Sequence, residues 1–372
     1  MANKNNHLIA AYQSLRLQTE SCVLATVIET FGSTYRKAGA RMLINQAGEM
    51  SGLLGGGCFE RDLQEQAKSV FETGQAKTLF YDMRAPDDVV WGLGLGCNGA
   101  VRVFLQLLRS ADDFNPLHWI ADSVALQQAG VLVTVFASTH ADFPVGHSLF
   151  VPTASTGNQS MLSTAPFPFA TTALQTLLQQ KPRIATHVID GSEIAVFYDP
   201  VQPPWRLLVC GAGIDAVPLV ACAKALGWQV TVMDHRPAYI QPSRFPMADH
   251  LVQLFPEEVA TKLDLDQFSA LILMTHNIEY DQRYLQIMVN SRIPFIGLLG
   301  PEPRKLRLLE GLGEDAELIS DRVYGPVGLD IGAETPEEIA LSIMAAVQAK
   351  LNGRNGQLLS AKLEVAMHEY SR

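Results

Sequence analysis

The most constraining feature of this sequence is a glycine turn between an apolar strand and an apolar helix, at residues 205–235, WRLLVCGAGIDAVPLVACAKALGWQVTVMDH. Gly211, Gly213 and Ala216 fit the pattern G-x-G-x-x-G/A, and Asp234 ends the next strand about 20 residues further on. In this motif the first glycine makes the tight turn, the second lets a ligand approach the backbone, and the small third residue lets helix and strand pack closely. The segment therefore predicts the first β-α-β unit of a Rossmann-like fold.

The rest of the second half continues the alternation of strands and helices. Strand-like segments at 270–274 and 293–299 are separated by helical stretches, which is typical of a parallel sheet with helices on its faces. A last helix is expected from Pro336, with Thr335 as its N-cap and Glu338 closing a capping box. We expect an α/β, doubly wound parallel-sheet domain over residues 205–350, followed by a polar tail at 351–372.

A Rossmann-like fold leaves open whether the domain binds a dinucleotide. Asp234 is placed to accept a hydrogen bond from a ribose hydroxyl, which favours NAD(P) and an NAD(P)-dependent oxidoreductase. Asp215, in contrast, sits inside the turn, where its carboxylate opposes a phosphate at the helix N-terminus. The sequence also offers no recognisable set of residues for hydride transfer. A dinucleotide site and a Rossmann domain without nucleotide are therefore both open interpretations.

The first half reads as a separate, mixed α/β domain over residues 1–200. A helix is expected at 7–20, a buried strand at 22–30, and a helix that ends at Thr73 before the stop signal Gly74. Residues 151–169 are rich in Ser, Thr and Pro and are typical of a surface loop. The prolines in residues 201–205, VQPPW, oppose regular structure and mark a boundary between the two domains.

Composition narrows the class of partner. The net charge is −10 and no basic face is evident, so nucleic acid is not an expected partner. No run of about 18 apolar residues is present, so we expect no stable membrane insertion. The first residues lack the apolar core of a signal peptide, so the expected compartment is the cytoplasm. The five cysteines include no C-x-x-C pair, and we expect free thiols.

Two of the cysteines stand in glycine-rich loops. Cys58 follows three glycines and precedes a helix, and Cys97 lies in residues 92–100, GLGLGCNGA. A thiol at a helix N-terminus has a lowered pKa, and bare glycine amides suit an anion or a soft metal. Glu60 and Asp62 in the first turn of the helix oppose an anion there. The alternative interpretation is a tight turn in which the cysteine is merely small.

The loop at 32–41, GSTYRKAGAR, adds hydroxyl groups and cations to the same half of the chain. Its alternative interpretation is an ordinary solvated loop. Together with two soft thiols, it favours a ligand that carries both a phosphate and a thiophilic group. In the second half, His276 follows a strand at its C-terminal end, where open α/β sheets bind ligands.

These segments resemble the XdhC/CoxI family, the xanthine dehydrogenase accessory factors. GSTYRKAGARMLI, GGGCFERDL and GLGLGCNG are similar to the N-terminal signature of the family. LLVCGAGI, VTVMDHRPAY, ILMTHNIEYDQRYL and IPFIGLLGPEPRKLRLL are similar to its C-terminal Rossmann domain. One departure is Ile214, which stands where the family commonly has a histidine and weighs against dinucleotide binding.

The resemblance implies a molybdenum cofactor chaperone rather than an enzyme. Such a protein binds the cofactor, a pterin dithiolene with a phosphate, and supports its sulfuration by a cysteine desulfurase. It then delivers the cofactor to a molybdenum hydroxylase such as xanthine dehydrogenase. A homodimer belongs to the same expectation. By position, Cys58 and Cys97 would contact the cofactor or its molybdenum, and the loop from Gly32 to Arg41 would hold the pterin or the phosphate.

Two further alternatives belong to other classes of protein. One is a thiol-redox protein that uses Cys58 and Cys97, and the other is a scaffold that only docks partner proteins. The residues that we predict to contact a cofactor are Ser33, Thr34, Arg36, Arg41, Gly55, Gly56, Gly57, Cys58, Gly96, Cys97, Gly211, Gly213, Asp234 and His276.

Overall fold

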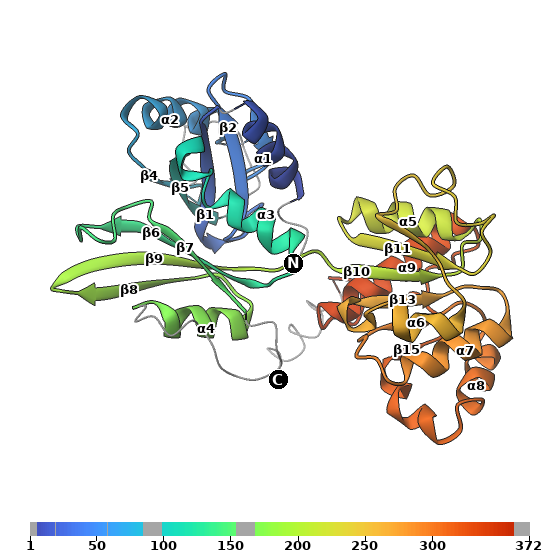
Figure 1. Ribbon diagram of the computed structural model, residues 1–372. Helices are drawn as coiled ribbons and strands as arrows, with labels where there is room; N and C mark the ends of the chain where they lie inside the picture. The colour runs from blue at the N-terminus through green and yellow to red at the C-terminus, as the bar shows by residue number, and fades with distance from the viewer. Residues whose placement is uncertain (1–5, 19, 58, 85–98, 154–167, 361–372) are drawn as a thin grey trace. The chain divides into compact units, whose positions relative to one another are not determined.

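The computed structural model describes residues 6–18, 20–57, 59–84, 99–153 and 168–360. The chain divides into two compact units, Met1–Pro203 and Pro204–Arg372, coloured from blue to green and from yellow to red in Figure 1. Each unit has its own sheets and its own hydrophobic core. Among the described residues, no helix is both long and apolar enough to cross a membrane.

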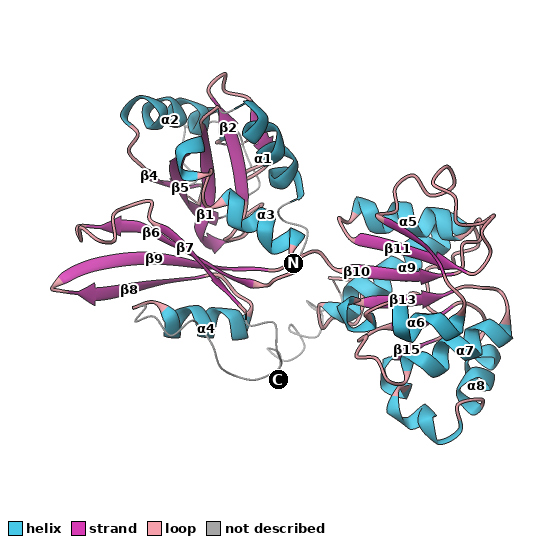
Figure 2. Ribbon diagram, viewed as in Figure 1, coloured by secondary structure: helices cyan, strands magenta, loops and turns pink. Residues whose placement is uncertain are grey.

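The first unit contains a five-stranded antiparallel sheet in the order β3-β2-β1-β5-β4. Its strands are β1 (Cys22–Gly32), β2 (Arg41–Asn45), β3 (Met50–Gly52), β4 (Lys77–Asp82) and β5 (Gly99–Leu108). Helix α2 (Glu60–Thr73) packs on one face, and α1 (Asn6–Gln18) and α3 (Leu117–Ala125) cover the other (Figure 2). Because both faces are covered, the first seven residues of β1 are all buried.

A second antiparallel sheet of the first unit has the order β7-β6-β9-β8. Its strands are β6 (Gly130–Ser138), β7 (Ser148–Pro152), β8 (Arg183–Ile189) and β9 (Ser192–Val201), and α4 (Ala170–Gln179) packs on it. The two sheets meet through a small cluster of buried side chains, Ile28, Phe104, Phe136 and Phe197. Most of the predicted surface loop at 151–169 lies outside the described residues, as do the final residues 361–372 of the predicted tail.

The second unit is built on a six-stranded parallel sheet in the order β12-β11-β10-β13-β14-β15. Its strands are β10 (Arg206–Cys210), β11 (Gln229–Asp234), β12 (His250–Gln253), β13 (Ala270–Leu273), β14 (Ile296–Leu298) and β15 (Val323–Tyr324). Its helices are α5 (Ala216–Ala225), α6 (Pro256–Lys262), α7 (Ile278–Met288), α8 (Glu302–Glu310) and α9 (Pro336–Leu351). Short 3₁₀ helices among the described residues are Ser110–Asp112, Leu265–Gln267, Gly313–Leu318 and Ser320–Arg322.

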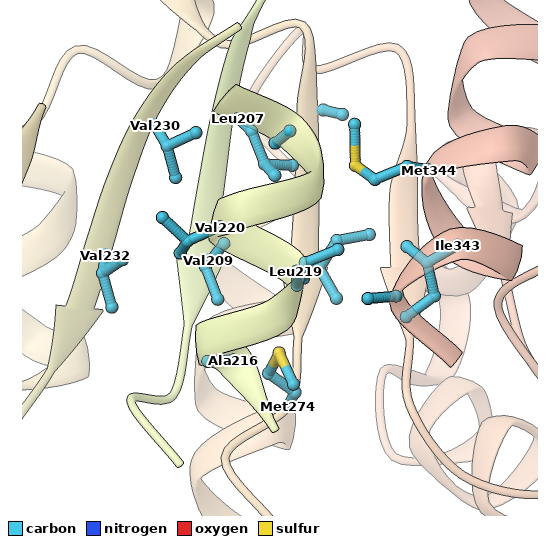
Figure 3. Packing of buried hydrophobic residues seen from close by; sticks show 14 of the residues in the cluster. Leu207, Val209, Ala216, Leu219, Val220, Val230, Val232, Met274, Ile343 and Met344 are labelled. Carbon is cyan, nitrogen blue, oxygen red and sulfur yellow. The ribbon is translucent and has the colours of Figure 1, made fainter. Parts of the chain in front are cut away.

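The helices lie on both faces of this parallel sheet, so the predicted fold class is confirmed. Figure 3 shows α5 and α9 against one face, where Leu219 and Ile343 pack over the β10 side chains Leu207 and Val209. The helices α6, α7 and α8 bury their apolar side chains on the opposite face. The predicted capping box is also present, because the Glu338 amide donates to the Thr335 hydroxyl and the Thr335 amide donates to the Glu338 carboxylate.

Candidate functional site

The predicted N-terminal segments meet at one end of the five-stranded sheet. Gly32 at the end of β1 pairs with Gly99 at the start of β5. A side chain at Gly99 would collide with the carbonyl oxygen of Ser33, so the loop at 33–40 lies directly against β5. The glycine loop at 53–57 follows β3 at the same end, and a Cβ at Gly56 would lie 3.5 Å from the ring of Tyr35. The fold therefore brings the hydroxyl-rich loop, the glycine loop and the start of β5 together.

Three of the predicted site residues cannot be placed in this cluster. Cys58, Gly96 and Cys97 lie outside the described residues. Their neighbours in sequence, Gly57 and Gly99, are described and belong to the two segments above.

The glycine loop uses its backbone amides to bind a carboxylate of the chain itself. Glu60, which is buried, accepts hydrogen bonds from Gly55 N at 2.6 Å, Gly57 N at 2.9 Å and Phe59 N at 3.3 Å. The sequence suggested that these amides would bind an anion and that Glu60 would oppose it. The two suggestions are linked, because Glu60 is itself the anion that the amides bind. The signal in the sequence was a glutamate at the first residue of the helix, within reach of the preceding amides.

The loop at 33–40 presents its polar and aromatic side chains beside the glycine loop. The hydroxyl of Thr34 donates to the carbonyl of Arg36 at 3.0 Å, and Lys37 Nζ donates to the same hydroxyl at 3.4 Å. Arg36 is half-buried and forms no ion pair with any residue that the structure describes. Ser33 is exposed, and the side chain of Tyr35 is 58% exposed.

Arg41 lies apart from these exposed groups, in the interior of the first unit. Its guanidinium Nη2 is 2.7 Å from Oδ2 of Asp199 on β9, and the two side chains are only 2% and 5% exposed. Nη1 of Arg41 also donates to the carbonyl of Gly39 at 3.3 Å. The guanidinium therefore joins β2 of the first sheet to β9 of the second. This buried ion pair gives Arg41 a structural role, and the ligand contact that the sequence suggested stays a prediction.

In the second unit, the turn after β10 holds the predicted nucleotide residues. Asp234 is buried at the end of β11 and accepts four hydrogen bonds. Its Oδ2 accepts from Ala212 N at 2.8 Å and from Arg236 Nη2 at 2.7 Å, and its Oδ1 accepts from Arg236 N and Nε, both at 2.9 Å. A carboxylate has about four lone-pair sites, so these bonds use all of them. Burial raises the pKa of Asp234, but the hydrogen bonds from Arg236 and Ala212 outweigh it and leave the pKa lowered.

The two glycines of the turn differ in how closely the chain packs against them. Gly211 has φ +112°, and a Cβ there would collide with the carbonyl oxygen of Met274 after β13. A Cβ at Gly213 would collide with Oδ1 of Asp215. Close packing against the backbone after β13 therefore accounts for Gly211 without a pyrophosphate, whereas Gly213 faces the end of a side chain that can move.

His276 lies where the strand order reverses between β10 and β13. It has the left-handed φ of +58°, and its side chain is 60% exposed. Its Nε2 lies 2.8 Å from Oδ2 of Asp215, which holds the ring across the end of β10. The crevice at such a reversal is the usual ligand site of open α/β sheets, and a strained residue there is typical of functional positions.

A second polar group beside His276 was not predicted from the sequence. Asp281 is buried, and its two oxygens accept hydrogen bonds from Thr275 Oγ1 at 2.6 Å and from Arg304 Nη2 at 2.8 Å. The group ties the loop after β13 to α7 and α8. Only the local pattern Thr-His-Asn-x-x-x-Asp hinted at it, because Arg304 comes from a later helix.

These contacts do not fit a bound dinucleotide. The acceptor for a ribose hydroxyl has no lone pair left, and Asp215 adds a negative charge beside the helix N-terminus that a pyrophosphate would use. Within the described residues, no group of three or more His, Cys, Asp or Glu side chains is arranged to hold a metal ion.

We expect no saturable binding of NADH or NADPH to this chain. The physical reason is the occupied carboxylate of Asp234, which would have to release Ala212 or Arg236 to accept a ribose hydroxyl. A titration followed by nicotinamide fluorescence checks this, with a known dehydrogenase as the positive control. A saturating signal near one nucleotide per chain would contradict the expectation and would favour the oxidoreductase interpretation.

Comparison with known proteins adds the family context. A family model described as the XdhC Rossmann domain matches residues 207–347, and one described as the XdhC and CoxI family matches residues 15–82. A curated relative from Bacillus subtilis, named as a probable xanthine dehydrogenase subunit, is 34% identical over 331 residues, which are 88% of this chain and 92% of the relative. "Molybdenum cofactor insertion chaperone PaoD" of Escherichia coli is 24% identical over 88% of this chain and 83% of its own length.

A solved structure agrees with these matches. It is described as a xanthine dehydrogenase from Bacillus halodurans, and it is 30% identical to this chain. The similarity covers 95% of this chain and 97% of the other, with a TM-score of 0.75. The likeness therefore extends over both units rather than over the Rossmann-like unit alone.

Proposed function

The chain belongs to the XdhC and CoxI family, and from this premise we propose that it binds the molybdenum cofactor and delivers it to a molybdenum hydroxylase of the xanthine dehydrogenase type. The similarity to a protein named as a molybdenum cofactor insertion chaperone supports this accessory role. We propose an accessory protein rather than an enzyme, since no arrangement for hydride transfer accompanies the occupied glycine turn in the described part of the second unit.

The observation that carries the proposal is the meeting of the loop at 33–40, the glycine loop and the start of β5 at one end of the five-stranded sheet. The loop at 33–40 supplies an aromatic ring, hydroxyl groups and the cations Arg36 and Lys37 beside the glycine loop. These groups fit a ligand with a flat pterin ring and a phosphate. Cys58 and Cys97 adjoin the same loops in sequence, and a thiolate is the side chain best suited to a soft metal centre.

In this proposal the chain binds and orients the cofactor. When bound, the cofactor supplies a molybdenum ion held by a dithiolene, which is the chemistry that the hydroxylase uses. The cations of the loop at 33–40 neutralise the phosphate, and the glycine loop allows a close approach because it has no bulky side chains. The thiols of Cys58 and Cys97 are the proposed contacts to the molybdenum end.

Two further parts of the proposal concern partners. We propose that a cysteine desulfurase sulfurates the cofactor while the chain holds it, and that the chain acts as a homodimer in the cytoplasm. Co-purification with a cysteine desulfurase tests the first part, and light scattering of the purified chain tests the second. A monomer at all concentrations would remove the dimer from the proposal.

The proposed function predicts retention of molybdenum. After incubation with released molybdenum cofactor and desalting, the wild type should keep about one molybdenum and one pterin per chain. Cys58→Ala and Cys97→Ala should each lose most of both, because a thiolate bond to a metal is not replaced by a methyl group. Metal analysis and pterin fluorescence of the desalted protein measure the two contents.

The matched control is Cys222→Ala, which changes a half-buried thiol of the second unit. It should retain as much cofactor as the wild type. Equal losses in all three variants would assign the effect to the loss of any thiol rather than to the two glycine loops. A well-folded wild type that retains no cofactor would overturn the proposed function.

A further inference from the structure

The buried carboxylate of Glu60 occupies the amides of the glycine loop, and this affects how a ligand can be oriented at this end of the sheet. We propose that Glu60 excludes phosphate from the glycine loop, so that a phosphate-bearing pterin lies with its ring against Tyr35 and its phosphate at Arg36. This inference rests on the proposed function, because it concerns how the same ligand is oriented. It assigns Glu60, Tyr35 and Arg36 as the residues that determine specificity.

The amides of the glycine loop are occupied by a carboxylate of the chain. A glycine loop before a helix is ordinarily a phosphate site, because its N–H groups and the helix dipole both favour an anion. Here Gly55 N, Gly57 N and Phe59 N already donate to Glu60. Among the described residues, no cation forms an ion pair with Glu60, so its charge faces an incoming phosphate without a counter-ion. The phosphate therefore meets both occupied donors and a like charge.

The ring of Tyr35 lies beside the glycine loop. A Cβ at Gly56 would be 3.5 Å from Cδ2 and Cε2 of the ring, so the ring faces this part of the loop across a gap of about one methyl group. Gly56 has φ +68°, a conformation that glycine adopts without strain. More than half of the Tyr35 side chain is nevertheless exposed. An aromatic ring held from one side and open elsewhere is suited to stack a flat heteroaromatic ring.

Arg36 is the cation next to this ring in the sequence. Arg36 follows Tyr35 directly, is half-buried, and forms no ion pair with a described residue. Lys37 Nζ donates to the Thr34 hydroxyl, and this bond leaves two of its three N–H groups for other acceptors. Positive charge is therefore available in the loop at 33–40, whereas negative charge fills the glycine loop. This difference fixes which end of a phosphate-bearing ligand faces which loop.

Binding of two simple pterins tests the orientation. The probes are neopterin and neopterin monophosphate, which differ only in the phosphate, and equilibrium dialysis measures both dissociation constants. The wild type should bind the phosphorylated probe more tightly. Arg36→Gln should weaken binding of neopterin monophosphate by about 10-fold and leave neopterin unchanged, because only a charge-assisted hydrogen bond is lost. Tyr35→Leu should weaken both probes by about 10-fold, because stacking is lost for either.

Glu60→Gln tests the exclusion itself. The amide keeps the shape of the side chain and removes its charge, so inorganic phosphate should compete with neopterin monophosphate about 5-fold more strongly than in the wild type. Arg61→Gln, an exposed cation on the same helix, is the control and should change none of these values. Circular dichroism verifies that each variant is folded. If Glu60→Gln does not fold, Tyr35→Leu and Arg36→Gln still test the orientation.

The outcomes separate this inference from the proposed function. If the wild type retains molybdenum cofactor after desalting but Arg36→Gln weakens both pterins equally, the orientation is wrong and the proposed function stands. Unchanged binding in Tyr35→Leu, or no binding of either pterin by the wild type, also overturns the orientation. Failure of the wild type to retain the cofactor overturns the proposed function instead.

Discussion

Asp199→Ala should lower the free energy of unfolding of the first unit by about 3–5 kcal/mol, because it removes the carboxylate that forms a buried ion pair with the guanidinium of Arg41. Nη2 of Arg41 and Oδ2 of Asp199 are 2.7 Å apart and the two side chains are almost fully buried, so the guanidinium is shielded from bulk water. For a unit of this size, the change corresponds to a fall in melting temperature of about 10 °C. Scanning calorimetry of the full chain should show one transition moved and the other unchanged.

The control for this prediction is Glu193→Ala. Glu193 is an exposed carboxylate on the same strand as Asp199, so its loss should shift the same transition by less than about 2 °C. A similar shift in both variants would mean that the effect comes from the strand and not from the buried charge.

The double variant Arg41→Met with Asp199→Leu tests what the pair is for. Replacing both charges by apolar side chains of similar volume is often neutral or stabilising, so much of the lost stability should return. If Arg41 is structural, this variant should also keep its molybdenum cofactor in the desalting experiment. A stable double variant that retains no cofactor would restore Arg41 to the binding site.

The second large effect is expected at the glycine turn of the second unit. Gly211→Ala should destabilise that unit by about 3 kcal/mol or more, through strain at a φ of +112° and a collision with the backbone of Met274. The colliding atom is a main-chain oxygen of the loop after the neighbouring strand, so it has little freedom to move. Chemical unfolding followed by circular dichroism measures the loss.

Gly213→Ala provides the comparison within the same motif. Its added methyl group would collide with Oδ1 of Asp215, the far end of a side chain that can rotate away. Its φ also lies outside the left-handed region, so the variant should stay within about 1 kcal/mol of the wild type. A dinucleotide site makes the opposite demand, since there the second glycine lets the pyrophosphate approach. If Gly211→Ala is as stable as the wild type, the turn is not closely packed against the backbone of Met274.

The sequence predicted the second unit well because its signals are local. The pattern around Gly211 and the capping box at Thr335 each lie within a few residues, and both set the backbone directly. The occupied carboxylates were harder to predict. Asp234 has the residue type and position of a ribose acceptor, and only the arrangement of Arg236 around it shows that its lone pairs are used.

The first unit shows more clearly which contacts a sequence does not predict. Arg41 in a loop of hydroxyls and cations looks like a ligand contact, yet its partner Asp199 stands on a strand of another sheet. No periodicity or local motif reports a pair so far apart in the chain. The sequence did identify the loops that come together, because glycine and hydroxyl residues are enriched where strands end and ligands approach. It did not show which of their side chains face one another.

Cells hold far more free phosphate and nucleotide than any rare pterin, and both compete for exposed glycine turns. In this chain two such turns are filled from within, one by Glu60 and one by Asp234. Because these carboxylates are covalently part of the chain, their local concentration exceeds that of any dissolved anion. A dissolved anion therefore competes poorly for the amides of these two turns.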